Sequence, residues 1–307
     1  MFSAVVFAYS EVGKRCLEAL LDQGVQVPLV FTHADTPGET RWYGSVAEVA
    51  RAHGVPTVTA APAQEDWHER VAALAPHYLF SFYYRSMLAP TLLAAARWGA
   101  LNMHGSLLPR YRGRAPVNWA ILNGERETGA TLHYMTDRPD AGPIVAQQAV
   151  PIGPDDDALA VSMAVAAAAR ELLVRCLPRL TQGPPPGEAM DLAQGSYFGG
   201  RRPEDGRIDW AWPVHRVHDL IRAVAPPFPG AFTEAQGCRI VFAGSHFSGE
   251  TAAHPGLAPC LYDADGRLYL DCRGGRVRLD AVFVDGTRLT AQDFPRRFGP
   301  GPLRLTA

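Results

Sequence analysis

The chain has 307 residues, of which 47% are hydrophobic and 20% are charged. These values are typical of a soluble globular protein with a substantial core in one large or two ordinary domains. The formal net charge of −2 and a pI near 6.5 give no general electrostatic attraction to nucleic acid, which argues against a nucleic-acid partner.

The first half of the chain alternates predicted strands and helices. Apolar runs of strand length, such as 3–9, are followed by segments whose apolar residues recur with the period of a helix. These segments end at a glycine, such as Gly24. This βαβ pattern predicts an α/β domain with a Rossmann-like, mostly parallel sheet. The predicted strands are 3–9, 27–32, 55–59, 77–84, 99–105, 128–135 and 143–152, and the predicted helices end at 24 or span 42–53, 90–97, 116–124 and 155–180.

The turn after the first predicted strand lacks the dinucleotide-binding fingerprint. A pyrophosphate needs the close backbone approach that Gly-x-Gly-x-x-Gly allows, but the chain has only Ser10-Glu11-Val12-Gly13 there. We therefore expect no dinucleotide cofactor, although the Rossmann-like outline alone would suggest one.

The pattern changes after a proline-rich stretch. Gln182-Gly-Pro-Pro-Pro-Gly187 cannot continue a helix, and it predicts a linker over 182–200. Beyond it lie one predicted helix, 214–224, and short apolar runs at 239–243, 268–272 and 277–282 that suggest a small β-barrel or sandwich. We therefore expect an N-terminal domain at 1–188 that carries the functional site and a C-terminal β domain at 201–307.

Cysteine spacing and apolar runs indicate the cellular compartment in which the protein is expected. The five cysteines include no Cys-x-x-Cys pair, so we expect them to be reduced. The N-terminus has no basic leader, and the apolar-rich stretch 158–174 is interrupted by Ser162, Arg170 and Glu171. We expect a cytoplasmic protein that is not inserted in a membrane; the sequence leaves a homo-oligomer open.

Asn102 and His104 are the first candidate functional residues. They stand two apart in the strand predicted at 99–105, so their side chains face the same way. Asp140, in a Pro-Asp-Ala-Gly turn, can reach back to the imidazole, fix its tautomer and raise its pKa. The alternative for Asn-x-His is a turn former beside a structural surface histidine. A zinc site at His104 and His133 lacks a third ligand.

A stiff loop and several short motifs complete the pattern. The loop Ser106-Leu-Leu-Pro-Arg-Tyr-Arg-Gly-Arg-Ala-Pro116 has three arginines and two prolines, as expected of a fixed shape that faces anions. Four features together resemble the folate-dependent formyltransferase family. They are Asn-x-His, this loop, Asn123-Gly124 with Glu127-Thr128-Gly129, and Asp140-x-Gly142. Members of this family formylate methionyl-tRNA, glycinamide ribonucleotide or sugar nucleotides.

The resemblance implies a fold, a co-substrate and binding residues. It implies an OB-like C-terminal domain, 10-formyltetrahydrofolate as the formyl donor and no metal. Backbone groups at 86–88 would face the pterin ring, and Arg114 would contact the folate or hold the loop. The implied folate-binding residues are Ser86, Met87, Leu88, Arg114, Thr136, Asp137, Arg138, Pro139 and Asp140.

The chemistry of formyl transfer assigns roles to the three candidate catalytic residues. Attack of the amine on the formyl carbon places negative charge on the formyl oxygen, and the Asn102 amide can stabilise this oxyanion. His104 is expected to act as the general acid at the departing folate nitrogen, with Asp140 raising its pKa. The group that finally accepts the proton of the amine is left open.

The acceptor is expected to be a nucleotide-linked amino sugar. Several segments resemble the branch of the family that formylates UDP-4-amino-4-deoxy-L-arabinose for lipid A modification and polymyxin resistance. These segments include VVFAY at 5–9, VFTHADTPGE at 30–39 and HGSLLPRYRGRAPVNW at 104–119. We expect a stand-alone member, because the sequence ends at Ala307 without the decarboxylase domain often fused to that branch.

Other functions remain as alternatives. A dTDP-4-amino-6-deoxyhexose could be the acceptor instead, and methionyl-tRNA is a further alternative that would require affinity for tRNA. A folate- or nucleotide-binding module without turnover is the non-enzymatic alternative. A complete set of Asn102, His104 and Asp140 argues against that module, because a sensor needs no such set.

Overall fold

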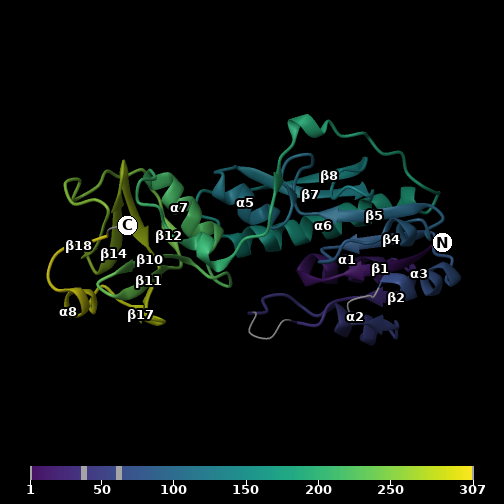
Figure 1. Ribbon diagram of the computed structural model, residues 1–307, viewed down its shortest axis with the longest axis horizontal. Coiled ribbons are helices and arrows are strands. Elements are labelled where there is room, and N and C mark those ends of the chain that lie inside the picture. Colours follow the sequence, from purple (N-terminus) through teal and green to yellow (C-terminus); the bar gives the residue numbers. More distant parts are fainter. Residues whose placement is uncertain (1, 36–39, 60–63, 306–307) are drawn as a thin grey trace. The chain divides into compact units, whose positions relative to one another are not determined.

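The computed structural model describes residues 2–35, 40–59 and 64–305 (Figure 1). The last four residues of the VFTHADTPGE motif, 36–39, lie outside the described residues. The helices are α1 Ser10–Asp22, α2 Val46–Ala52, α3 Gln64–Ala73, α4 Pro90–Leu93, α5 Pro116–Leu122, α6 Ala158–Leu180, α7 Val214–Ala223 and α8 Phe294–Phe298. The strands are β1 Ser3–Ala8, β2 Gln26–Phe31, β3 Thr57–Val58, β4 Tyr78–Phe82, β5 Gly99–His104, β6 Arg112–Gly113, β7 Glu127–Tyr134, β8 Ile144–Pro151, β9 Tyr197–Phe198, β10 Ala231–Ala235, β11 Cys238–Phe242, β12 Ser245–His246, β13 Cys260–Ala264, β14 Arg267–Cys272, β15 Gly275–Leu279, β16 Val282–Val284, β17 Thr287–Leu289 and β18 Leu303–Arg304.

The chain divides into two compact units. The first comprises residues 1–116, 127–151 and 162–199, and the second comprises 117–126, 152–161 and 200–307. The proline-rich stretch and the residues after it, up to 199, therefore belong to the first unit. Within the segment 182–200, expected as a linker, Glu188 forms a bridge with Ile144 and β9 pairs with β6.

The first unit is built on a seven-stranded sheet in the order β3-β2-β1-β4-β5-β7-β8. The pairs from β3 to β5 are parallel, whereas β5, β7 and β8 pair antiparallel. The predicted Rossmann-like, mostly parallel sheet is confirmed. The short connection between β7 and β8 explains why these two strands pair antiparallel, since a parallel crossover needs a dozen residues or more.

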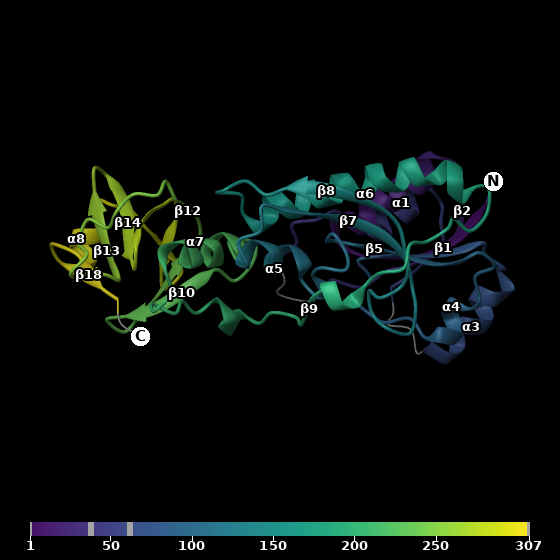
Figure 2. The same ribbon diagram turned by 90° about the horizontal axis from the view of Figure 1, so that it is seen from above.

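Helices cover both faces of this sheet. Figure 2 shows α1 and α6 over one face, and α3 and α4 on the opposite side. Alternate residues of one strand enter different cores, so Leu101 and Met103 of β5 join the cluster under α1 and α6, while Ala100 joins the cluster with Leu92 of α4. Strand alternation therefore turns Asn102 and His104 away from the α1 and α6 side.

The second unit contains two antiparallel sheets, in the orders β10-β11-β16-β17 and β12-β15-β14-β13-β18. The prediction of a small β domain after the α/β domain is confirmed. Every strand is short because glycine turns interrupt the apolar runs, for example at Gly237, Gly266 and Gly286, all of which have positive φ.

Several predicted boundaries were wrong. The helix expected at 42–53 begins only at Val46, because the Ser45 side chain caps it by accepting from the Glu48 N–H at 3.2 Å. The helix expected at 90–97 ends at Leu93, because Arg97 N donates to Pro76 O at 3.0 Å instead of continuing the helix. The strand expected at 277–282 is two strands, separated at residues 280–281.

Some elements had no prediction. They comprise the helices α3 and α8 and the strands β6, β9, β10, β12, β13, β17 and β18. Most are only two to five residues long, which is too short for a hydrophobic period to be recognised. Within the part of the chain that the structure describes, no helix is long and apolar enough to cross a membrane.

Candidate active site

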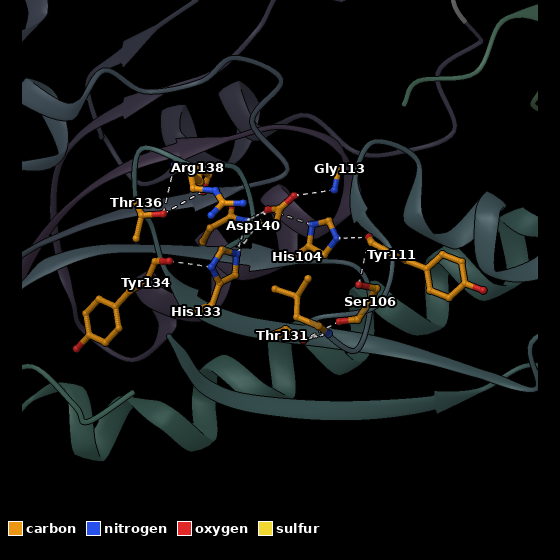
Figure 3. Close-up of polar contacts among 12 residues, drawn as sticks. His104, Ser106, Tyr111, Gly113, Thr131, His133, Tyr134, Thr136, Arg138 and Asp140 are labelled. Atoms are coloured by element: carbon orange, nitrogen blue, oxygen red, sulfur yellow. Dashed lines mark hydrogen bonds and ion pairs between the residues drawn. The ribbon is translucent and has the colours of Figure 1, made fainter. Parts of the chain in front are cut away.

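Two neighbouring strands position four polar side chains. In the antiparallel pair of β5 and β7, Asn102 lies opposite His133, and His104 lies opposite Thr131. Directly opposed residues of an antiparallel pair share a face of the sheet. The two histidines, 29 positions apart in sequence, therefore lie on one small area of the sheet (Figure 3).

Asp140 lies above this area and joins its members. Its Oδ1 lies 3.5 Å from His104 Nδ1 and 3.6 Å from His133 Nε2, and it accepts from Asn102 Nδ2 at 3.4 Å. Its Oδ2 accepts from the Gly113 N–H at 2.9 Å. The structure thus brings together the three predicted catalytic residues around one carboxylate, whose side chain is 13% exposed.

The backbone of the loop after β5 fixes the His104 ring. His104 Nε2 lies 2.8 Å from the carbonyl oxygen of Tyr111, and the His104 side chain is buried. A carbonyl oxygen can only accept, so Nε2 must carry a hydrogen and donate it. In the neutral ring, Nδ1 is then the atom with a lone pair, and it faces Asp140 (Figure 3).

The same reasoning orients Asn102. His133 Nδ1 lies 2.8 Å from the Tyr134 carbonyl oxygen and must donate to it, which leaves Nε2 of the neutral ring as an acceptor. Asn102 Nδ2 lies 3.0 Å from that Nε2 and donates to it. The Asn102 amide is therefore turned so that its NH2 group, and not its oxygen, lies between His133 and Asp140.

Burial sets the protonation state of His104. Burial of the ring lowers the pKa of His104 below its ordinary value, although Asp140 and the Tyr111 carbonyl both act to raise it. Asp140 acts in the expected direction, but removal of the ring from water outweighs one carboxylate at 3.5 Å. His104 is therefore neutral in the free protein at neutral pH.

The carboxylate responds differently. Burial opposes ionisation of Asp140, but His104, His133 and the Gly113 N–H together hold its pKa well below its usual range. The Gly113 N–H favours the charged carboxylate in every state of the site, and each histidine does so while its ring carries a second proton. At neutral pH the site thus combines an ionised carboxylate with an uncharged imidazole that can accept a proton.

The protonation state can be measured directly. We expect NMR titration of histidine-labelled protein to give His104 a pKa below about 6.5, its unperturbed value. The His104 signal would be assigned by its loss in His104→Gln. Because the folded-state pKa lies below the unfolded one, this histidine also makes unfolding easier as pH falls from about 6.5 through the folded-state pKa. A pKa above 6.5 in the folded protein would contradict the assignment.

Polar contacts hold the loop after β5 in a fixed shape. Ser106 Oγ donates to Arg110 O at 2.6 Å, so this buried serine closes a turn. Thr131 Oγ1 donates to Ser106 O at 2.6 Å and accepts from Leu108 N at 3.2 Å. Gln147 Nε2 donates to Leu108 O at 2.9 Å, so β7 and β8 both anchor the loop.

The residues expected to contact folate lie in three segments. Ser86, Met87 and Leu88 follow β4; the residue Met87 is 54% exposed, and Leu88 lies in the core. Arg114 follows β6 and is exposed. The third segment leads to Asp140: Asp137, Arg138 and Pro139 are exposed, and Thr136 Oγ1 bonds to both the N–H and the carbonyl of Arg138.

Sequence reasoning missed His133 and the backbone groups of Tyr111 and Gly113. His133 was considered only as a zinc ligand, and that site was rejected because no third ligand stands nearby in sequence. The alternation of Thr131 and His133 on a strand adjoining that of Asn102 and His104 was a usable signal. Backbone groups leave no such signal. Among the described residues there is no group of three or more histidine, cysteine or acidic side chains that could hold a metal ion.

Family models match both parts of the chain. Residues 3–177 match the model described as formyl transferase, and residues 201–299 match the formyl transferase C-terminal domain.

Solved structures resemble the chain at low sequence identity. An N-formyltransferase from Helicobacter canadensis, in complex with folinic acid and dTDP-3-aminofucose, has a TM-score of 0.73 at 19% identity and covers 91% of this chain and 98% of its own. WlaRD, a sugar 3N-formyl transferase in the presence of dTDP and 5-N-formyl-THF, has a TM-score of 0.66 at 17% identity, with coverage of 94% and 98%. HypX from Aquifex aeolicus, in complex with tetrahydrofolic acid, has a TM-score of 0.65 at 18% identity; 98% of this chain is covered but only 48% of HypX. These likenesses show the fold.

Proposed function

Because the chain belongs to the formyl transferase family, we propose that it transfers a formyl group from 10-formyltetrahydrofolate to the amino group of a nucleotide-linked sugar. The observation that carries the proposal is the position of the Asp140 carboxylate, within 3.6 Å of Asn102, His104 and His133. This arrangement supplies an N–H donor and a proton-accepting imidazole side by side, which are the two groups that acyl transfer to an amine requires.

The chain has residues that suit a folate. Met87 exposes an apolar side chain next to the polar Ser86, and a flat heteroaromatic ring needs both kinds of contact. Backbone groups at 86–88 and the polar segment 136–140 would hold the ring, and Arg114 would meet an acidic part of the molecule. When bound, the folate supplies the activated formyl group.

His104 moves the proton between the two nitrogens. The bond from the sugar nitrogen to the formyl carbon forms while His104 Nδ1 takes a proton from that nitrogen. His104 then returns this proton to N10 of the folate as the bond from N10 to the formyl carbon breaks. Between these events the ring is an imidazolium, which Asp140 stabilises at 3.5 Å while Tyr111 O holds Nε2.

Asn102 stabilises the negative charge that develops on the formyl oxygen. One of its N–H groups is held by His133 at 3.0 Å, and the other makes only a long contact of 3.4 Å with Asp140. The weakly held N–H is the one that donates to the formyl oxygen. Removing such a donor typically lowers kcat by about a hundred- to a thousandfold.

The finer proposal is that the acceptor is UDP-4-amino-4-deoxy-L-arabinose, as used in lipid A modification. The support is sequence similarity in segments at 5–9, 30–39 and 104–119. The runner-up is a dTDP-linked amino sugar, which is favoured by fold similarity to the enzyme in complex with dTDP-3-aminofucose.

An assay of formyl transfer distinguishes these acceptors. The purified protein is given 10-formyltetrahydrofolate with UDP-4-amino-4-deoxy-L-arabinose, a dTDP-4-amino-6-deoxyhexose or charged initiator tRNA, and products are identified by mass spectrometry. We expect the UDP-pentose to be formylated and the matched His104→Ala protein to be inactive. Formylation of the dTDP-hexose alone would overturn the finer proposal only. Folate binding without transfer to any acceptor would favour the binding module.

His133 gives a further prediction. We expect His133→Leu to lower kcat by about tenfold, because Asn102 loses the acceptor that orients its amide, and one hydrogen bond is worth about 1 kcal/mol. His133→Gln, whose side-chain oxygen can accept from Asn102, should recover part of the loss. The exposed His53→Gln is the control. An unchanged kcat in His133→Leu would show that Asn102 needs no such support.

A further inference from the structure

The segment 195–198, which follows the proline-rich stretch, lies along residues 109–114 of the loop after β5. Its backbone bonds run in both directions: Ser196 N donates to Pro109 O at 3.2 Å, and Arg112 N donates to Ser196 O at 3.0 Å. Arg114 N also donates to Phe198 O at 3.0 Å. These bonds form the short parallel pair of β6 and β9.

The two segments approach so closely that only glycine fits at two positions. A side chain at Gly113 would overlap the Phe198 carbonyl oxygen, and one at Gly195 would overlap the Pro109 carbonyl oxygen. The rings of Tyr111 and Phe198 stack at 5.3 Å, with planes 13° apart. This contact is therefore a close-packed part of the first unit and not a loose crossing of chains.

The residue at the centre of this contact has a strained backbone. Tyr111 has φ of 59°, in the left-handed region that residues other than glycine rarely adopt. Its carbonyl oxygen accepts from His104 Nε2 at 2.8 Å. Its own N–H donates to Ser196 Oγ at 2.8 Å. Strained conformations persist only where surrounding contacts enforce them, and Ser196 supplies one such contact.

The strand β6 thus has partners on both edges. On one edge, Tyr111 O and Gly113 N bond to His104 and Asp140. On the other edge, Arg112 N and Arg114 N bond to the backbone of 196–198. A displacement of 195–198 would therefore move the two backbone groups that hold the catalytic imidazole and carboxylate.

We propose that Ser196 is a positioning residue for formyl transfer, because its hydroxyl accepts from the N–H of Tyr111 and so fixes the strained backbone of the residue whose carbonyl holds the His104 ring. This inference rests on the proposed function and adds a residue that lies 85 positions after Tyr111 in the chain. Ser196 itself touches none of the reacting groups in this arrangement; it acts through Tyr111.

The test compares Ser196→Ala with the wild type in the formyl-transfer assay. The alanine variant removes only the hydroxyl that accepts from Tyr111, so we expect kcat to fall by about tenfold while KM for both substrates stays within about twofold. Ser196→Thr keeps a hydroxyl and should restore most of kcat. Ser248→Ala, which removes an exposed hydroxyl that bonds to Glu250, is the matched control.

A second readout separates positioning from general destabilisation. The Tyr111 carbonyl acts to raise the pKa of His104, against burial, with Asp140 also raising it and His133 lowering it. When Ser196→Ala lets this carbonyl move away, NMR titration should show a lower pKa for His104 than in the wild type. If Ser196 only stabilised the fold, Ser196→Ala would lower the fraction of folded protein and leave the pKa of His104 in the folded protein unchanged.

Gly195→Ala supplies a second variant that leaves the hydroxyl intact. Its new methyl group would push the segment away from Pro109, so it should lower kcat and the His104 pKa in the same direction. Unchanged kcat and unchanged His104 pKa in Ser196→Ala would overturn the positioning role while wild-type transfer still supports the proposed function. Absence of formyl transfer by the wild type would instead overturn the proposed function.

Discussion

Replacing His104 with alanine is expected to lower kcat for formyl transfer by about a hundred- to ten-thousandfold, the usual contribution of general acid–base catalysis. Of the three residues proposed to be catalytic, His104 is the one with an atom that can both take and return a proton near neutral pH. KM for the folate should change little, because the residues proposed to bind it lie in other segments. Steady-state kinetics with the proposed acceptor measures both quantities.

Two controls accompany this variant. Circular dichroism and thermal unfolding should show that His104→Ala is folded, since the lost side chain lies at the end of β5 and the hydrophobic clusters of the sheet do not include it. His104→Gln keeps a polar side chain of similar reach but cannot relay a proton, so it should be as inactive as the alanine variant. A turnover close to that of the wild type in either variant would remove His104 from the mechanism.

Replacing Asp140 with asparagine is expected to lower kcat by a similar factor, about a hundred- to ten-thousandfold. The substitution is nearly isosteric, and asparagine tolerates the left-handed φ of 50° at this position. It removes the negative charge that stabilises the imidazolium, so protonation of His104 during the reaction becomes less favourable. The amide of the new residue has only one oxygen, so it cannot replace both carboxylate oxygens, one of which accepts from Asn102 and the other from the Gly113 N–H.

The pH dependence of this variant identifies the cause. Asp140 acts to raise the pKa of His104, so NMR titration of Asp140→Asn should show a pKa lower than that in the wild type. Glu127→Gln, which neutralises an exposed carboxylate of β7, is the matched control and should leave kcat and this pKa unchanged. An unchanged His104 pKa in Asp140→Asn would mean that the carboxylate acts only as a hydrogen-bond acceptor for Gly113 and Asn102.

The sequence predicted the side chains of the site better than their surroundings. Asn102 and His104 could be placed on one face because strand geometry relates residues two apart, and a turn residue such as Asp140 can reach them. The pKa of His104 could not be predicted, because its direction depends on how deeply the ring is buried. His133 was missed because only the register of β5 and β7 places it beside Asn102.

The fold, like the site, could be predicted only in part from the sequence. Apolar runs predicted the α/β sheet and its later change to a small β domain, because those elements are long enough for a periodic pattern. The pair of β6 and β9 has two residues on each side, and its backbone bonds depend on no residue type except two glycines. Such contacts between distant segments can be seen only in the folded chain.

The pairing of β6 with β9 also sets the smallest fragment that carries a complete site. A chain cut at residue 188 would contain Asn102, His104 and Asp140, yet its loop at 109–114 would lose the backbone partners supplied by residues 196–198. Contacts between segments so far apart in sequence form late in folding, because closing the long loop between them costs conformational entropy. During synthesis, the arrangement of His104 is therefore completed only after residue 198 has been added, well after the catalytic side chains themselves.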